Sequence, residues 1–298
     1  MSFTAEIKDE LMEKENGKKC CNLAELAGII AFSSSIKNGY MKITLENKAV
    51  ARRIVKQLRK VADIQAGIEV KAGGGVRKND SFVISVVEYK KLLSCLGLSR
   101  GDNVCFPGKL LEKECCIKAF VKGAFLGGGS VSDPKKRYHL EFVTGYPDIG
   151  RGFADFFWNL EMKAGRVERR GKQVVYFKDC DVICDVLAMA GVMNGVVEIC
   201  QVKVIKDKKN ELNRLNNSEI ANICKAADAA TTQKLCIEKI RDTVGLDALP
   251  ESLKKLAQAR LDNPDISLAL LGEKMNPPIG KSGVNHRMRK IIEISKRY

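Results

Sequence analysis

The residues best suited to contact nucleic acid lie at the end of the 298-residue chain, between positions 281 and 298. An asparagine can pair with adenine and an arginine with guanine through base edges, which makes Asn285 and Arg289 candidates for base reading. His286 is of interest as a base or phosphate contact. This stretch contains six basic residues and one acidic residue, Glu293, and so has a local net charge of +5. The basic residues are Lys281, Arg287, Arg289, Lys290, Lys296 and Arg297. Cations at this density neutralise phosphates.

Two short helices are expected to position these side chains. Ser267 is predicted to cap the first helix, which carries Leu268, Leu271 and Met275, and Gly272 with the segment NPPIG then forces a turn. Ser282 is predicted to cap the second helix, whose buried stripe is Val284, Met288, Ile291 and Ile292. The pattern indicates a helix-turn-helix, in which the second helix enters the major groove. The alternative is a basic amphipathic helix that only packs on its own domain.

The composition also favours a polyanionic partner. The chain has 51 basic and 36 acidic residues, a net charge of +15 and a pI near 9.3. A surface of this charge attracts nucleic acid through counterion release; an anionic membrane surface or an acidic protein stays open as an alternative. Apolar runs of about 18 residues are absent, and the charged amphipathic N-terminus lacks the apolar core of a secretory signal. We therefore expect a cytoplasmic, nucleoid-associated protein without a membrane partner or a small-molecule substrate.

The eleven cysteines include two adjacent pairs, Cys20-Cys21 and Cys115-Cys116. Adjacent cysteines do not match the C-x-x-C spacing of a metal knuckle, and only two histidines could complete a site. Cys180 and Cys184 are one helical turn apart and could hold a metal, but buried free thiols are the favoured interpretation. All the cysteines are thus predicted to be small core residues, and neither metal nor cofactor is expected.

A repeat organises the first two thirds of the chain. The segments LAGIIAFSSS (26–35) and VKGAFLGGGS (121–130) align at an offset of 95 residues, which also superimposes the cysteine pairs and places Gly28 on Gly123. Each copy predicts the order α-β-β-α-β-β-α. Two such copies would pack as a pseudo-twofold pair, with the glycine-bearing helices at the interface because they lack bulk. The expected divisions are residues 1–104 and 105–198 for the two halves, 199–232 for a helical linker and 233–298 for the helix-turn-helix domain.

The repeated segments resemble the motif of LAGLIDADG homing endonucleases. In that family each motif helix ends in an acidic residue that binds a divalent metal at the scissile phosphate. These acidic positions fall here on Ser33 and Gly128, which cannot serve as anionic ligands. Asp133 is a possible substitute, but it lies beyond the helix end and has no counterpart in the first copy. Strand cleavage is therefore not expected.

The whole chain resembles the WhiA family of bacterial DNA-binding regulators. The resemblance is carried by SFTAEIKDEL, CCNLAELAG, FVKGAFLGGGSVSDPKKRYHLEF, NRLNNSEIAN and PPIGKSGVNHRMRKI. It implies an α+β fold, a duplicated LAGLIDADG-like αββαββα domain followed by an all-α helix-turn-helix domain. It also implies transcription regulation linked to cell division, chromosome segregation and, in sporulating species, sporulation.

Double-stranded DNA is the expected partner, and the helix-turn-helix is its expected reader. Base contacts are assigned to Lys281, Ser282, Asn285, His286 and Arg289, phosphate contacts to Arg287, Lys290 and Arg297, and Ser267 is included in the binding site. A second DNA surface, or a merely solvated sheet face, is expected from the cations of the hairpins: Arg166, Arg169, Arg170, Lys172 and Lys178, with Arg77 and Lys78 in the first copy. Two other functions stay open: a residual metal-dependent endonuclease, and a scaffold that binds a sigma factor or another regulatory protein.

Overall fold

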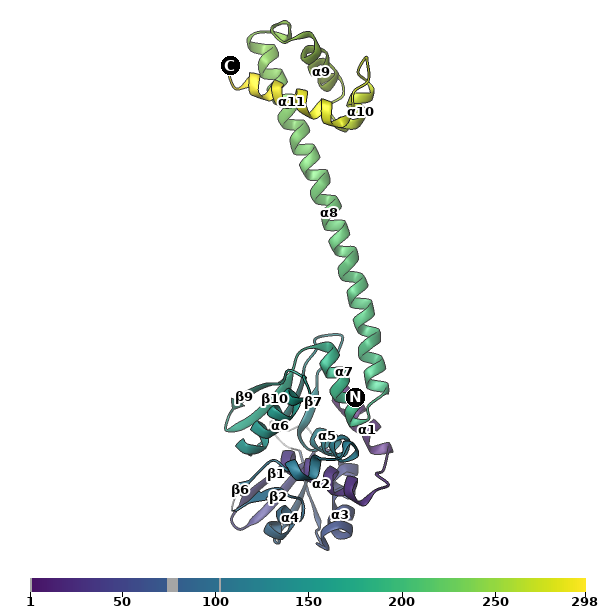
Figure 1. Ribbon diagram of the computed structural model, residues 1–298, viewed down its shortest axis with the longest axis vertical. Coiled ribbons are helices and arrows are strands. Elements are labelled where there is room, and N and C mark those ends of the chain that lie inside the picture. The colour runs from purple at the N-terminus through teal and green to yellow at the C-terminus, as the bar shows by residue number, and fades with distance from the viewer. Residues whose placement is uncertain (1, 74–79, 102) are drawn as a thin grey trace. The chain divides into compact units, whose positions relative to one another are not determined.

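The computed structural model describes residues 2–73, 80–101 and 103–298 and divides the chain into two compact units, residues 1–206 and 207–298 (Figure 1). The helices of the first unit are α1 (Phe3–Glu13), α2 (Lys19–Ser33), α3 (Lys48–Ala62), α4 (Tyr89–Cys95), α5 (Glu114–Gly128), α6 (Pro147–Asn159) and α7 (Cys180–Ala190), with the 3₁₀ helix η1 (Gly108–Leu111). Its strands are β1 (Ser34–Lys37), β2 (Tyr40–Leu45), β3 (Ile68–Lys71), β4 (Ser81–Val86), β5 (Ser99–Arg100), β6 (Asn103–Val104), β7 (Gly129–Val131), β8 (Leu140–Thr144), β9 (Gly165–Arg169) and β10 (Lys172–Phe177). Helix α8 (Asn194–Thr243) begins in this unit and ends in the second, which also contains η2 (Leu246–Ala248), α9 (Glu251–Asp262), α10 (Leu268–Glu273) and α11 (Lys281–Ser295).

The first unit consists of two copies of one arrangement. The order α2-β1-β2-α3-β3-β4-α4 recurs as α5-β7-β8-α6-β9-β10-α7, which confirms the predicted repeat. The strands form two antiparallel four-stranded sheets of equivalent order, β1-β2-β4-β3 and β7-β8-β10-β9. In the view of Figure 1 the two sheets lie on either side of the paired helices α2 and α5. A single hydrophobic core runs through both copies.

Local sequence explains where the strands turn. Asn38-Gly39 joins β1 to β2 and Arg170-Gly171 joins β9 to β10, and all four residues have positive φ. Two left-handed residues in succession form the type I′ turn, whose twist matches that of the adjoining strands. Both loops therefore close tight hairpins and fix the register of the strands on either side.

Helices α2 and α5, called here the seam helices, approach each other backbone to backbone. A Cβ atom added to Gly123 would lie 2.0 Å from the carbonyl oxygen of Glu25, and one added to Gly28 would lie 2.3 Å from that of Phe120. Both distances are far shorter than any real carbon–oxygen contact, so only glycine fits at either position. The predicted role of the two glycines at the interface is confirmed.

A buried carboxylate, Glu25, lies beside this contact and was not foreseen from the sequence. Its side chain is 1% exposed and receives hydrogen bonds from Gln57 Nε2 (2.9 Å) and Asn16 Nδ2 (2.7 Å). Two cations flank it, Lys122 Nζ of α5 at 3.3 Å and Arg53 Nη1 of α3 at 3.6 Å. Burial lowers the pKa of Lys122, and the negative charge of Glu25 acts in the opposite direction. This network of hydrogen bonds and ion pairs connects α2, α3 and α5 beside the seam.

The second unit has its own core. Ile237 and Ile240 of α8 pack with Leu253, Leu256 and Ala257 of α9 and with buried residues of α10 and α11. Pro250 precedes the first residue of α9, where its missing N–H is not needed. Among the described residues, the structure contains no helix with the length and apolar character required to cross a membrane.

The cysteines do not all behave as predicted. Cys95, Cys200 and Cys224 are exposed, so the expectation that every cysteine is a core residue is wrong. Cys200 and Cys224 lie on α8, where composition alone cannot distinguish a covered helix face from an open one.

Candidate nucleic-acid interface

Helix α10 and the chain after it form a fixed turn. The Ser267 side chain accepts a hydrogen bond from Leu270 N (3.3 Å), which confirms its predicted role as the helix cap. At Gly272 an added Cβ would lie 2.1 Å from the carbonyl oxygen of Ile279, whose own N–H donates to the Gly272 carbonyl at 3.1 Å. The returning chain therefore packs directly on the end of α10. Met275, predicted to lie on this helix, follows its end at Glu273, although its side chain is buried.

A buried arginine holds the segment that precedes α10. The Arg260 side chain is almost wholly buried, and its Nη1 donates to the carbonyl oxygens of Ile266 (2.8 Å), Pro264 (3.3 Å) and Asn263 (3.4 Å). Burial lowers the pKa of this guanidinium, although nearby Asp265 acts to raise it. Sequence reasoning missed Arg260, because a single arginine on an amphipathic helix is normally solvated.

Helix α11 begins two residues earlier than its predicted cap allows. Gly280 is the N-cap, without a side-chain cap, and its carbonyl accepts from Val284 N at 3.1 Å. The prediction that Ser282 caps this helix is wrong, because Ser282 is already its second residue and its backbone is helical. The predicted stripe is buried at Val284, Met288 and Ile291, whereas Ile292 is half-buried.

Four of the predicted DNA contacts lie on the side of α11 opposite this stripe. Ser282, Asn285, His286 and Arg289 are spaced three, four and seven residues apart, which places them on one helix face. His286 and Arg289 are exposed and Asn285 is half-buried. The other predicted contacts flank this face or lie elsewhere: Lys281 and Lys290 are exposed on α11, Arg287 is half-buried at the edge of the stripe, Arg297 follows the helix, and Ser267 caps α10.

The C-terminal ends of the seam helices carry Ser33 and Gly128, the positions predicted from the LAGLIDADG resemblance to replace catalytic acids. The Ser33 hydroxyl donates to the carbonyl of Ile29 at 2.6 Å. Gly128 has no room for a side chain, since an added Cβ would lie 2.4 Å from the Val143 oxygen and 2.6 Å from the Phe32 oxygen. Asp133 accepts a hydrogen bond from Lys135 N (2.9 Å) in the loop after β7. In the described part of the chain, only four cysteines elsewhere form a convergent set of three or more His, Cys, Asp or Glu ligand atoms.

Helix α1 packs against this same end of the seam. Thr4 Oγ1 donates to the Val131 carbonyl (2.8 Å) and accepts from the Val131 N–H (2.9 Å), which attaches α1 to β7. A cavity of about 690 Å³ lies beside it, lined by residues that include Lys8, Glu46 and Gly127–Ser130. Burial lowers the pKa of Lys8, while Glu46 acts to raise it. The cavity is thus lined by one lysine and one glutamate, whereas a metal site for DNA cleavage would need two convergent carboxylates.

The basic residues of the last hairpin divide between the two faces of its sheet. Arg169 and Lys172 are cross-strand partners and therefore share one face, whereas Arg166 pairs with the core residue Val175 on the other. Arg166 Nη1 donates to Gln173 Oε1 at 3.1 Å. Lys178 Nζ lies 5.2 Å from the centre of the Tyr176 ring, and Arg170 is in the turn. Arg77 and Lys78 lie outside the described residues.

The duplicated α+β unit and the helical unit that follows it define a class of protein: a LAGLIDADG-like domain joined to a DNA-binding helix-turn-helix domain. The family models give the assignment for each segment. Residues 19–99 match the WhiA N-terminal LAGLIDADG-like domain, 117–209 the WhiA LAGLIDADG-like domain and 212–295 the WhiA C-terminal HTH domain. The chain belongs to the WhiA family.

Relatives of known name match over almost their full length. A protein of Alkaliphilus metalliredigens named "Probable cell division protein WhiA" is 37% identical, with 100% of this chain and 98% of the relative covered. A protein of the same name from Desulfitobacterium hafniense is 38% identical, with 100% and 96% covered. The crystal structure of full-length DUF199/WhiA from Thermotoga maritima matches with a TM-score of 0.57 and 26% identity, over 100% of this chain and 99% of that chain.

Proposed function

We propose that this protein is a sequence-specific reader of double-stranded DNA and a transcription regulator of the WhiA type. The observation that carries the proposal is the polar, basic face of α11, presented by a helix whose opposite stripe is buried. A helix held in this way can enter the major groove with its first turns against base edges.

The side chains of α11 divide by the contacts they would make. Lys281, Ser282, Asn285, His286 and Arg289 read bases, because most of them lie on the exposed face that starts at the helix N-terminus. Arg287, Lys290 and Arg297 neutralise phosphates, and Ser267 holds the start of α10 within the same site.

The proposal includes an absence of nuclease activity. Metal-dependent cleavage needs carboxylates that hold divalent ions at the scissile phosphate. Ser33 uses its hydroxyl within its own helix, and Gly128 is surrounded by backbone oxygens. Both observations support a DNA-binding protein rather than an enzyme.

The cellular role we propose follows from the named relatives and from the family resemblance. The relatives are named for cell division, and we extend this to chromosome segregation and, in a host that sporulates, to sporulation. A cytoplasmic, nucleoid-associated location is part of the same proposal. A fluorescent fusion that fails to overlap with the nucleoid would count against it.

Two variants of the full chain test the base-reading assignment. Arg289→Ala should cost about 1–3 kcal/mol of binding free energy on the specific site and leave binding to random duplex almost unchanged. Lys296→Ala, which removes a positive charge just after α11, should weaken binding to every sequence alike and reduce the slope of the salt dependence by about one. Fluorescence anisotropy on a genomic site and on random DNA, over a series of salt concentrations, measures both effects.

The proposal fails if Arg289→Ala loses the same free energy on specific and random DNA. It also fails if the unmodified chain shows no preference among genomic fragments. Incubation of plasmid DNA with Mg²⁺ or Mn²⁺ tests the absence of cleavage, and strand breaks that a chelator abolishes would overturn that part.

A further inference from the structure

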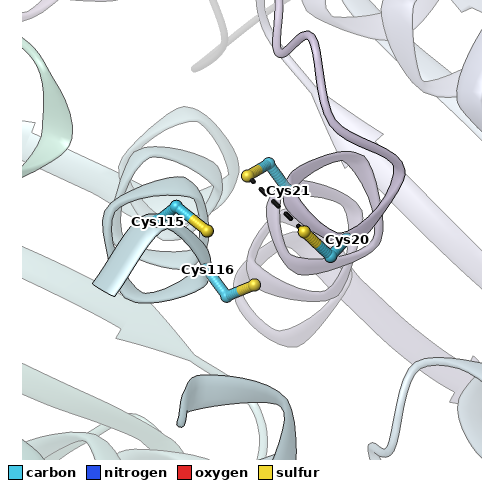
Figure 2. A group of neighbouring side chains, drawn as sticks. All are labelled: Cys20, Cys21, Cys115 and Cys116. Atoms are coloured by element: carbon cyan, nitrogen blue, oxygen red, sulfur yellow. Dashed lines mark hydrogen bonds between the residues drawn. The ribbon is translucent and has the colours of Figure 1, made fainter. Parts of the chain in front are cut away.

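Four thiols meet at the N-terminal ends of the seam helices. Cys20 and Cys21 lie in the first turn of α2, and Cys115 and Cys116 lie in the first turn of α5. Their four Sγ atoms are all within 4.8 Å of one another, and the Sγ atoms of Cys20 and Cys21 are 4.0 Å apart. Figure 2 shows the two pairs in the space between the helices, directed toward each other.

The duplication of the fold explains this convergence. Cys20-Cys21 and Cys115-Cys116 occupy equivalent positions of the two copies. A pair of residues that faces the pseudo-twofold axis in one half is met there by its equivalent from the other half. Two adjacent cysteines per copy therefore place four ligands around one point, although neither pair has the spacing of a metal knuckle by itself.

The arrangement fits a tetrahedral thiolate site. In a Zn–Cys₄ centre the Zn–S bonds are about 2.3 Å long, which corresponds to about 3.8 Å between sulfur atoms. The thiols need to contract by only about 1 Å from the upper limit of 4.8 Å, a shift that cysteine side chains can make by small χ1 rotations. Sulfur ligands select zinc and other soft ions over Mg²⁺ or Ca²⁺.

The surroundings of the thiols are suited to negative charge. Neither helix has a side-chain cap, so the free N–H groups of both first turns point toward this end, where the helix dipoles favour anions. Cys21 and Cys116 are buried, and Cys20 and Cys115 are half-buried. Glu25, one turn after Cys21, is occupied by Arg53, Lys122, Gln57 and Asn16 and does not compete as a ligand.

The thiols also influence one another's protonation. Burial acts to raise the pKa of Cys20, but hydrogen bonds from the other three thiols bring it below its ordinary value. Burial and the neighbouring sulfurs raise the pKa of Cys21 to about 11 and that of Cys116 to about 12.

We propose that Cys20, Cys21, Cys115 and Cys116 bind one zinc ion, which joins the two LAGLIDADG-like halves at the N-terminal ends of α2 and α5. Four protein ligands leave no open coordination position, so the site is structural rather than catalytic. The proposal departs from the expectation based on cysteine spacing alone, and it does not depend on the DNA-binding role of α11.

Cobalt and zinc binding to the full chain test the site. The protein is purified with a phosphine reductant, stripped with a chelator and titrated with Co²⁺. We expect the visible bands of a tetrahedral cobalt–thiolate complex, saturating at one Co²⁺ per chain and bleached by Zn²⁺. Thermal unfolding of the Zn²⁺-loaded chain should have a higher midpoint than that of the stripped chain, because the ion binds the folded state.

Single substitutions assign the ligands. Cys20→Ser and Cys115→Ser should each abolish the tetrahedral cobalt bands and the Zn²⁺-dependent rise of the unfolding midpoint. Cys105→Ser is the matched control, a half-buried thiol of the same unit outside the group, and it should keep both. Circular dichroism of the metal-free variants shows whether each one is folded before metal is added.

Three outcomes overturn the proposal. The first is a fully reduced, folded chain that gives no cobalt–thiolate bands and no zinc stoichiometry by elemental analysis. The second is a loss of the bands in Cys105→Ser equal to that in Cys20→Ser. The third is an interhelical disulfide, found by mass spectrometry of the chain isolated without reductant, in a protein that binds no metal after reduction.

Discussion

The same pseudo-twofold axis relates α2 to α5 at both ends of the seam helices, but the residues that meet at the two ends differ in chemistry. At the C-terminal end the backbones crowd together, Gly128 has no room for a side chain, and Ser33 bonds within its own helix. At the N-terminal end four thiols converge, and next to them the Glu25 side chain binds two cations and two amides. A duplicated fold therefore brings equivalent residues together along its pseudo-twofold axis, and local packing decides whether their side chains can bind a ligand.

The largest effect is expected at the backbone contact between α2 and α5, which holds both ends of the seam helices in place. Gly123→Leu should abolish cooperative unfolding of the first unit, since the Cβ alone would lie 2.0 Å from the Glu25 oxygen. Fluorescence of the single tryptophan, Trp158 on α6, reports this unit during thermal unfolding. Gly108→Leu is the control, because nothing lies within 4 Å of a Cβ there. A normal transition in Gly123→Leu would show that the seam is not close-packed.

A smaller loss is expected from the buried carboxylate near the thiol end. Glu25→Gln leaves Arg53 and Lys122 without their counter-charge, and it should lower the free energy of unfolding by about 3 kcal/mol. Glu114→Gln, which removes the exposed partner of Lys118 on α5, should leave the unfolding curve unchanged. Urea titrations followed by Trp158 fluorescence compare the two. Equal losses would mean that burial of Glu25 contributes nothing.

A third prediction concerns the attempt to restore acids at the C-terminal end. The double variant Ser33→Asp, Gly128→Asp should still not cleave plasmid DNA with Mg²⁺, and it should be less stable by about 2 kcal/mol because Gly128 has no space for a side chain. The single variant Ser33→Asp is the control: the difference in stability between it and the double variant is the loss caused by Gly128→Asp. Metal-dependent nicking by the double variant would contradict this prediction. It would show that the missing carboxylates alone, and not the lack of space at Gly128, prevent a metal site at the C-terminal ends of α2 and α5.

The smallest effect is expected on the sheet that follows this end. If the outer face of β9 and β10 contacts phosphates, Lys172→Ala should reduce the salt slope of binding to random duplex by about one. Arg166→Ala is the control on the opposite face, where the side chain bonds Gln173. Anisotropy titrations over a series of salt concentrations measure both slopes. Equal reductions of the two slopes would contradict the prediction that DNA contacts only the outer face of β9 and β10.

Much of the fold follows from local and periodic features of the sequence. The 95-residue offset predicts both copies and the glycine interface, and turn residues such as Asn38-Gly39 mark the hairpins. Ser267 caps its helix as expected from its own neighbourhood. The prediction for Ser282 in α11 is wrong, because serine is accepted both as a cap and inside the first turn, and only the path of the chain separates the two positions.

The candidate sites depend more on distance in space than on spacing along the chain. Arg260 and Glu25 are ordinary charged helix residues in the sequence, and their burial arises from segments that fold over them. The basic hairpin residues could not be assigned to faces until the register of β9 against β10 was known. Such properties are set by contacts between residues far apart in the chain.

The repeat, the membership of the WhiA family, the absence of acids at positions 33 and 128 and the basic character of the last helix all follow from the amino-acid sequence. These are properties of residue identity and of order along one chain. Two features depend on the packing of distant segments: the lack of space for an Asp at Gly128, and the convergence of the four thiols of Cys20, Cys21, Cys115 and Cys116. The physical reason is that the pseudo-twofold packing of α2 on α5 brings together atoms that lie 95 residues apart in the chain.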